Sequence, residues 1–409
     1  MCNVIREANQ IHINAFDSPS IVREFLITLK EAIFKAGYEE LIVYTRNKGA
    51  FYPNVVVPIC GIVDYYNENG IADIETQSEG YRRDKSIIRS CSPVDNESDL
   101  HRPLSKIWRF STLSELYLIQ RALINELRKE EVFADGVLEG IEWSVNEVMD
   151  NVLNHSTATS GFIMGQLHRS TKHVAFTIYD AGIGIYNSFK DSGNNIGSNI
   201  DALSKCLQEG VTRDSRVGQG NGLAGLFSLI KEGNGMLSIS SGSDTLSYRE
   251  GQMFTLLKQN KTISKRNAGT IVDFQIDYST DVSIDKILTF QGHTFEFVNL
   301  FIDDIEGEDG ILHFKISEIA EGTGTRESAM RVKNQLLNSI KATKKGALID
   351  FEGVNVVSSS FIDELLAKLV IEMGLFQFNQ RISLKNMSPL LQKTLQKSVI
   401  QRIVEDYSR

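Results

Sequence analysis

The amino-acid sequence predicts an α/β protein built from more than one domain. The chain has 409 residues, and at roughly 150 residues per domain this length indicates two or three domains. Strand-like and helix-like hydrophobic patterns alternate near both ends of the chain, as they do in α/β units. Apolar residues make up 42% and charged residues 23%, a composition that argues against a disordered, collagen-like or coiled-coil protein.

Charge and hydropathy limit the partners that we expect. Asp and Glu number 52 against 43 Lys and Arg, so a general affinity for nucleic acid or for anionic membranes is not expected. No apolar run approaches the ~18 residues of a membrane helix, and the N-terminal residues do not resemble a secretion signal. The cysteines form no CxxC pair, which is typical of reduced thiols. We therefore expect a cytoplasmic protein.

Residues 1–110 predict a small α/β module followed by a linker, with no motif that indicates its chemistry. The stretch 76–103 is polar and contains two X-Pro bonds, so we expect an irregular connection there. The predicted elements are strands over 11–16 and 41–44, a helix over 18–37 and a helix between 58 and 70.

The middle of the chain combines regular elements with one long irregular stretch. Residues 180–234 are rich in Gly, Ser, Asn and Asp, and a stretch of that length without structure inside a domain is usually a lid or a binding loop. The predicted elements are helices over 112–128 and 135–155 and strands over 161–167, 173–179, 235–240 and 269–276.

The helix at 135–155 displays two kinds of side chain. An apolar stripe at helical spacing marks its buried side. Glu147 and Asn151 are one turn apart on another side, with His155 one turn further. An amide oxygen can ligate Mg²⁺, and a carboxylate can orient or deprotonate an attacking water. Taken alone, these residues also fit a solvated polar face.

Two glycine-containing loops follow. Asp180 ends a predicted strand and begins the sequence Asp-Ala-Gly-Ile-Gly; a carboxylate there can accept a hydrogen bond from an exocyclic amine, although a simple Asx turn fits too. Gly218, Gly220 and Gly222 precede an apolar run, and a glycine-rich loop that opens a helix presents N–H groups to phosphates. This second loop is neither a Walker A loop nor a dinucleotide-binding fingerprint, and alone it also fits a flexible linker.

The order of these motifs resembles the GHKL ATPase superfamily. That superfamily includes histidine kinases, anti-sigma-factor serine kinases, mismatch-repair ATPases, gyrase-type topoisomerases and a class of chaperones. The resemblance covers about residues 115–278 and implies a GHKL (Bergerat) α/β sandwich over 111–280, with ATP and Mg²⁺ as cofactors. Residues 146–155 look most like the helix of the anti-sigma kinases.

The resemblance implies a role for each matching residue. Asn151 would hold Mg²⁺ against the triphosphate, and Glu147 would be the catalytic base or would orient the attacking group. Asp180 would bind the adenine amino group, and Thr270 would close the adenine side. The glycines would shape the adenine floor (Gly182 and Gly184) and contact the phosphates at the hinge of the lid (Gly218, Gly220 and Gly222).

Residues 285–409 predict a third unit, and its sequence resembles STAS and STAS-like domains over about 305–405. Ser360 takes the place of the phosphorylatable serine of that family, whereas Ser358 replaces the preceding aspartate. A helix N-cap is the alternative role for these serines. The predicted elements are strands over 311–316, 347–351 and 382–385 and helices over 326–341, after 360 and over 388–402.

Together these resemblances imply a regulatory Mg-ATP-binding protein of the anti-sigma-kinase type. ATP would switch a contact between the STAS-like module and a protein partner or a second copy of the chain, by phosphoryl transfer or by hydrolysis with lid closure. Two alternatives stay open: an ATPase clamp that dimerises on ATP without phosphorylating a protein, and a nucleotide sensor without turnover.

Overall fold

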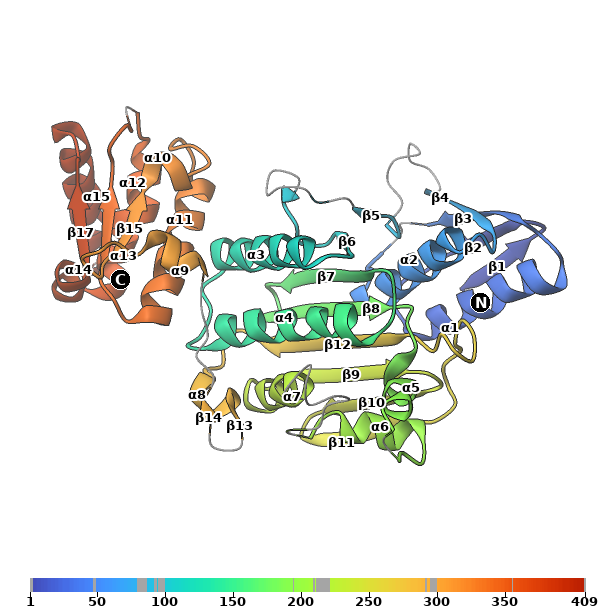
Figure 1. Cartoon of the computed structure of the whole chain (residues 1–409). Helices are drawn as coiled ribbons and strands as arrows, with labels where there is room; N and C mark the ends of the chain where they lie inside the picture. Colours follow the sequence, from blue (N-terminus) through green and yellow to red (C-terminus); the bar gives the residue numbers. More distant parts are fainter. Residues whose placement is uncertain are drawn as a thin grey trace. The chain divides into compact units, whose positions relative to one another are not determined.

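The computed structural model describes residues 3–46, 49–78, 87–91, 94, 100–193, 195–208, 210, 221–290, 293–294, 300–354 and 356–407. The chain forms two compact units (Figure 1). The first contains residues 1–123 and 140–295, and the second contains residues 124–139 and 296–409. The predicted segments 1–110, 111–280 and 285–409 divide the chain by family resemblance, and those boundaries stay a prediction.

The N-terminal module has a four-stranded sheet in the order β1-β2-β3-β4. β1 and β2 are antiparallel, and the other neighbours are parallel. Helix α2 begins at Pro53, so the predicted start at 58 was wrong: Pro53 needs no N–H in the first turn, and Pro58 lies inside the helix. The elements are β1 (Val4–Glu7), β2 (Gln10–Ile13), α1 (Ser20–Lys30), a π-helix (Glu31–Lys35), β3 (Glu40–Thr45), α2 (Pro53–Glu68) and β4 (Asp73–Ser78).

An eight-stranded sheet forms the centre of the first unit, in the order β11-β10-β9-β12-β8-β7-β6-β5. Among the described strands of this sheet, β5 and β6 pair in parallel and the other neighbours are antiparallel. The four strands predicted in the middle of the chain are confirmed as β7, β8, β9 and β12. The strands are β5 (Ser90–Cys91), β6 (Ile107–Phe110), β7 (Gly161–His168), β8 (His173–Asp180), β9 (Met236–Ser241), β10 (Asp244–Arg249), β11 (Gln252–Leu256) and β12 (Thr270–Asp277).

Both helices predicted in the middle of the chain are confirmed, as α3 (Leu113–Glu130) and α4 (Val137–His155). The stretch 180–234 is more regular than predicted, because it contains α5 (Gly184–Asp191), α6 (Asn199–Lys205) and α7 (Gly222–Glu232). Ser198 caps α6 by accepting a hydrogen bond from the Asp201 backbone N–H. The unit ends with α8 (Ile284–Ile287), β13 (Thr289–Phe290) and β14 (His293–Thr294).

Helices cover both faces of the eight-stranded sheet. On one face α4 approaches β7 so closely that a Cβ on Gly161 would lie 2.8 Å from Val152 Cγ1. On the other face α2 contacts β7, β8 and β12. A Cβ on Gly61 of α2 would lie 2.4 Å from the Tyr179 ring, so only glycine permits this approach. The N-terminal module therefore shares one hydrophobic core with the large sheet.

The second unit has a three-stranded parallel sheet in the order β15-β16-β17. The three strands and the helices predicted for this region are confirmed. The elements are α9 (Leu300–Ile305), β15 (Leu312–Lys315), α10 (Ile316–Ile319), α11 (Arg326–Thr343), β16 (Ala347–Asp350), α12 (Ser359–Ile362), a π-helix (Asp363–Ala367), α13 (Lys368–Met373), α14 (Leu375–Arg381), β17 (Ile382–Lys385) and α15 (Pro389–Tyr407).

The connection between α3 and α4 belongs to this second unit. The Asn338 side chain of α11 donates to the carbonyls of Arg128 and Glu131 at 2.9 Å and 2.7 Å. Its oxygen accepts from the Phe133 backbone N–H at 2.8 Å. Arg331, also on α11, pairs with Glu126 at 2.9 Å. A buried amide and a largely buried ion pair thus bind the end of α3 and the connection that leads directly into α4. Among the described helices, none is long and apolar enough to cross a membrane.

Candidate functional site

The site starts on α4, where Glu147 and Asn151 face the first residue of α7. A Cβ on Gly222 would lie 2.7 Å from Glu147 Oε2 and 3.4 Å from Asn151 Nδ2. The distances mean that the start of α7 is in contact with these two side chains and that a larger residue would push them away. The structure thus brings together three of the predicted residues, and it places an acid, an amide and a helix N-terminus in one place.

The Glu147 carboxyl is half-buried, and its pKa is raised to about 7. Burial is the main cause, and the negative charge of Asp150 adds to it. A carboxylate with a pKa near the working pH is well suited to take a proton and release it again. This is the property that a general base needs at this position.

Asp180, the last residue of β8, is 4% exposed. Its Oδ1 accepts a hydrogen bond from the Gly182 backbone N–H at 2.8 Å. Burial raises its pKa to about 7, although the Gly182 bond acts in the opposite direction. Within the described residues no cation is paired with Asp180, so its second oxygen can accept a hydrogen bond from a ligand.

The turn after Asp180 is packed against the end of α4. A Cβ on Gly182 would lie 2.0 Å from the Ser156 carbonyl oxygen, and the Ile183 N–H donates to that oxygen at 2.8 Å. Gly184 has a φ of +78°, which side-chain-bearing residues rarely adopt. Ser156 directly follows α4, so this turn and the Glu147–Asn151 pair belong to one site.

Thr270, the first residue of β12, pairs in register with both Asp180 and Ser241. Ser241 Oγ donates to the Gly269 carbonyl at 3.1 Å and accepts from the Ile185 N–H at 2.9 Å. It also lies 3.3 Å from Thr270 Oγ1. Ser241 was not predicted from the sequence, because its place depends on the pairing of β9 with β12. It fixes the strand end, the turn and α5 relative to one another.

Two of the predicted site residues lie outside the described part of the chain, namely Gly218 and Gly220. The remaining predicted residues lie on one side of the sheet within the first unit. They form two groups, one at the start of α7 (Glu147, Asn151 and Gly222) and one at the end of β8 (Asp180, Gly182, Gly184 and Thr270).

The described residues of the site could supply one or two ligands of a magnesium ion, but not a full set. Within the described residues, no group of three or more His, Cys, Asp and Glu side chains could hold a metal ion by itself. Magnesium usually keeps waters and substrate phosphates among its ligands and takes one or two from the protein. The Asn151 amide oxygen is a hard donor of that kind.

Comparison with known proteins finds one family match and similarity to two solved structures. Residues 328–392 match the model of a STAS-like domain of unknown function, DUF4325. The mycobacterial sensor histidine kinase MprB is similar in structure, with 16% identity over 43% of this chain and 98% of that chain and a TM-score of 0.23. A blue-light activated histidine kinase from Erythrobacter litoralis has a kinase domain with 18% identity over 40% of this chain and 60% of that chain, at a TM-score of 0.19. No curated protein sequence matches the chain. The C-terminal region therefore contains a STAS-like domain.

Proposed function

We propose that the first unit binds Mg-ATP in the manner of the GHKL superfamily and that the chain is a regulatory protein of the anti-sigma-kinase type. One observation carries the proposal: a glycine helix start contacts Glu147 and Asn151, while the glycine turn after Asp180 packs against the end of the same helix. A nucleotide needs a phosphate end and a base end at a fixed separation, and α4 spans both.

Each residue then has a defined task. Asp180 accepts a hydrogen bond from the exocyclic amine of adenine, and Thr270 lies beside it on the paired strand. Asn151 would ligate Mg²⁺, which neutralises phosphate charge when it is bound. Glu147 takes the proton of the attacking hydroxyl or water, because its raised pKa suits proton transfer near neutral pH. The N–H groups at the start of α7 face the phosphates.

Product analysis distinguishes the kinase from its two alternatives. The full chain is incubated with γ-labelled ATP and Mg²⁺, and the label is followed. Label on a protein indicates a kinase, free labelled phosphate indicates an ATPase clamp, and intact ATP indicates a sensor. We expect turnover, since the Glu147 carboxyl faces the start of α7, where a general base could act on the attacking group. Intact ATP after long incubation would contradict the enzymatic part of the proposal.

The C-terminal module is proposed as the output of the switch. The connection that leads into α4 is bound by Asn338 and Arg331 of α11, so a movement of α4 on nucleotide binding would reach the STAS-like domain. Its partner would be another protein or a second copy of the chain. Hydrogen exchange with and without ATP should change in α11 and across 350–370. Unchanged protection there would contradict this part.

Ser360 is half-buried at the start of α12, and its hydroxyl lies 2.9 Å from that of Ser358. Ser358 accepts from the Phe361 N–H at 3.0 Å, so it caps the helix. The neighbouring Asp363 forms two hydrogen bonds of 2.6 Å with Arg402. These contacts support the capping role. Mass spectrometry after incubation with ATP tests the alternative: phosphate on Ser360 would show that the serine is an acceptor.

A further inference from the structure

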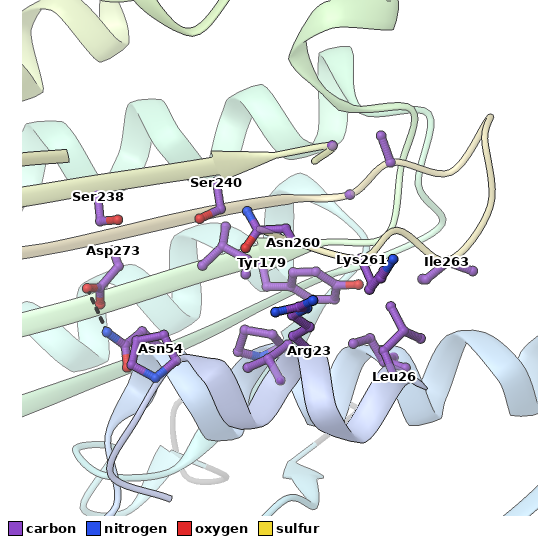
Figure 2. Close-up of a pocket in the computed structure, with 18 residues that line it drawn as sticks. Arg23, Leu26, Asn54, Tyr179, Ser238, Ser240, Asn260, Lys261, Ile263 and Asp273 are labelled. Carbon is purple, nitrogen blue, oxygen red and sulfur yellow. Dashed lines mark hydrogen bonds between the residues drawn. The ribbon is translucent and has the colours of Figure 1, made fainter. Parts of the chain in front are cut away.

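A second pocket lies on the face of the sheet that α2 covers, away from the proposed nucleotide site. It has a cavity volume of about 90 Å³, enough for several water molecules or one small organic molecule. It lies between α1 and α2 on one side and β8, β9 and β12 on the other, and residues 260–269 close it (Figure 2). Side chains alternate along a strand, so Tyr179 and Ile271 line this pocket while their neighbours Asp180 and Thr270 face the other site.

One end of the pocket is rich in hydrogen-bond acceptors. Asp273 Oδ1 accepts from the Thr177 hydroxyl at 2.7 Å, and its Oδ2 accepts from Asn54 Nδ2 at 3.0 Å. A carboxylate can accept about four hydrogen bonds, so Asp273 has acceptor capacity left. The Asn54 Oδ1 atom is buried and has no hydrogen-bond partner in the described part of the chain. Figure 2 shows these two side chains together at this end.

These acceptors are only partly compensated within the described residues. In the described residues Asp273 has no cationic partner, and its pKa is raised by burial. A half-buried carboxylate without a cation and a buried oxygen without a donor are both unfavourable. The start of α2 offsets part of the charge through its dipole. A ligand with several N–H donors would satisfy both groups.

The other end of the pocket is rich in positive charge and hydrogen-bond donors. Arg23 and Lys261 line it as exposed side chains, and neither has an ion-pair partner in the described residues. The Tyr179 hydroxyl points toward Lys261 in Figure 2. Lys30 fixes the closing segment by donating to the Thr262 carbonyl at 2.6 Å and adds positive charge nearby. This end therefore offers donors and cations, and apolar side chains also line the pocket (Leu26, Pro58, Ile62 and Ile271).

We propose that this pocket binds a small zwitterion with an ammonium group at one end and a carboxylate at the other. The ammonium would donate to Asp273 and to Asn54 Oδ1, since it carries three donors and a positive charge. The carboxylate would accept from Arg23, Lys261 and the Tyr179 hydroxyl. Methylene groups would pack on the apolar wall. The site is distinct from the proposed nucleotide site and does not depend on it.

Calorimetric titration of the full chain with ω-amino acids of increasing length tests this proposal without ATP. The probes are β-alanine, 4-aminobutanoate and 6-aminohexanoate, and the matched controls are butanoate and butylamine. We expect one length to bind best and each single-ended control to bind at least ~10-fold more weakly, because a charge-assisted hydrogen bond is lost. Absence of binding by all three zwitterions at millimolar concentration would overturn the proposal, as would a control that binds equally well.

Variants locate the binding. The double variant Arg23→Gln, Lys261→Gln changes only exposed side chains, so the fold should be kept. The variant Asp273→Asn removes the negative charge at the other end of the pocket. Each is expected to weaken the best probe by ~10-fold or more. Lys265→Gln is the matched control, since Lys265 is exposed in the closing segment but does not line the pocket, and it should bind as the wild type does. Equal affinity in the double variant and the control would overturn the assignment, and circular dichroism checks folding.

Discussion

The two faces of the eight-stranded sheet each hold an aspartate whose pKa is raised by burial, but these residues are built into the fold in different ways. Asp180 stands at the end of β8 and is bonded by the N–H of a residue two positions away. Asp273 stands inside β12 and is bonded by Thr177 and by Asn54, which is 219 residues away. The first aspartate belongs to a local turn, whereas the second depends on packing between distant elements.

The difference between the two aspartates decides which binding residues can be recognised from the sequence. The turn after Asp180 contains its glycines within a few residues of the aspartate. The candidate site residues on the α4 face can therefore be recognised from short sequence motifs. The α2 face has no motif, because its polar groups come from α1, α2 and three strands that meet only in the folded chain. We expect the two faces to act as separate sites.

The largest expected effect is the loss of turnover in Glu147→Ala. In the proposed mechanism the carboxylate acts on the attacking group and not on bound ATP, so ATP affinity should stay close to that of the wild type while kcat falls. General bases contribute typically ~10²- to 10⁴-fold. Steady-state kinetics with calorimetry separates the two quantities. Undiminished turnover would remove Glu147 from the mechanism and leave the α4 face as a binding surface only.

The next effect concerns the packing of the α2 face. Gly61→Ala would place a Cβ 2.4 Å from the Tyr179 ring, and we expect overpacking to lower the free energy of unfolding by ~1–3 kcal/mol. Helix propensity alone would stabilise the alanine variant by ~1 kcal/mol. A decrease in the free energy of unfolding would therefore indicate the close contact with the Tyr179 ring. Gly324→Ala is the control, because nothing lies within 4 Å of a Cβ there. Denaturant unfolding of both variants checks the prediction; a stabilised Gly61→Ala would contradict the close approach of α2.

A smaller effect is expected from pH. The pKa of Glu147 is raised to about 7, so the carboxyl gains a proton as the pH falls through that value and stops acting as a base. Asp180 has a similarly raised pKa, so its carboxylate also gains a proton in this pH range and accepts the hydrogen bond from adenine less well. We expect kcat/KM to fall by at least ~10-fold per pH unit below the pKa. A flat profile between pH 5.5 and pH 8 would show that neither group titrates in the free protein.

Local patterns were sufficient to predict much of the fold and of the candidate site. Glu147 and Asn151 are four residues apart on a long amphipathic helix, so their common side follows from helical geometry. Asp180 ends a strand whose residues are almost all buried, and that apolar run made the strand recognisable. For these residues the functional position depends on neighbours in the chain.

The remaining features depend on contacts that a single sequence does not reveal. β11 lies at the edge of the sheet with every residue exposed, so it lacks the alternation that identifies a strand. The short helices α5 and α6 lie in a stretch rich in Gly, Ser and Asn, whose local preferences indicate loops. Ser241 and Asp273 gain their roles only when β12 pairs with β9 and β8.

The proposed nucleotide site on the α4 face is tested most directly by one set of ATP titrations in the presence of Mg²⁺. Wild type, Asp180→Asn and Asp273→Asn are compared by calorimetry. We expect that the wild type binds ATP and that Asp180→Asn binds it ~5- to 150-fold more weakly, because a buried acceptor is replaced by an amide. Asp273→Asn, on the other face, should stay within about twofold of the wild type. Equal ATP affinity in the wild type and Asp180→Asn, or no binding by the wild type, would contradict a nucleotide site on the α4 face.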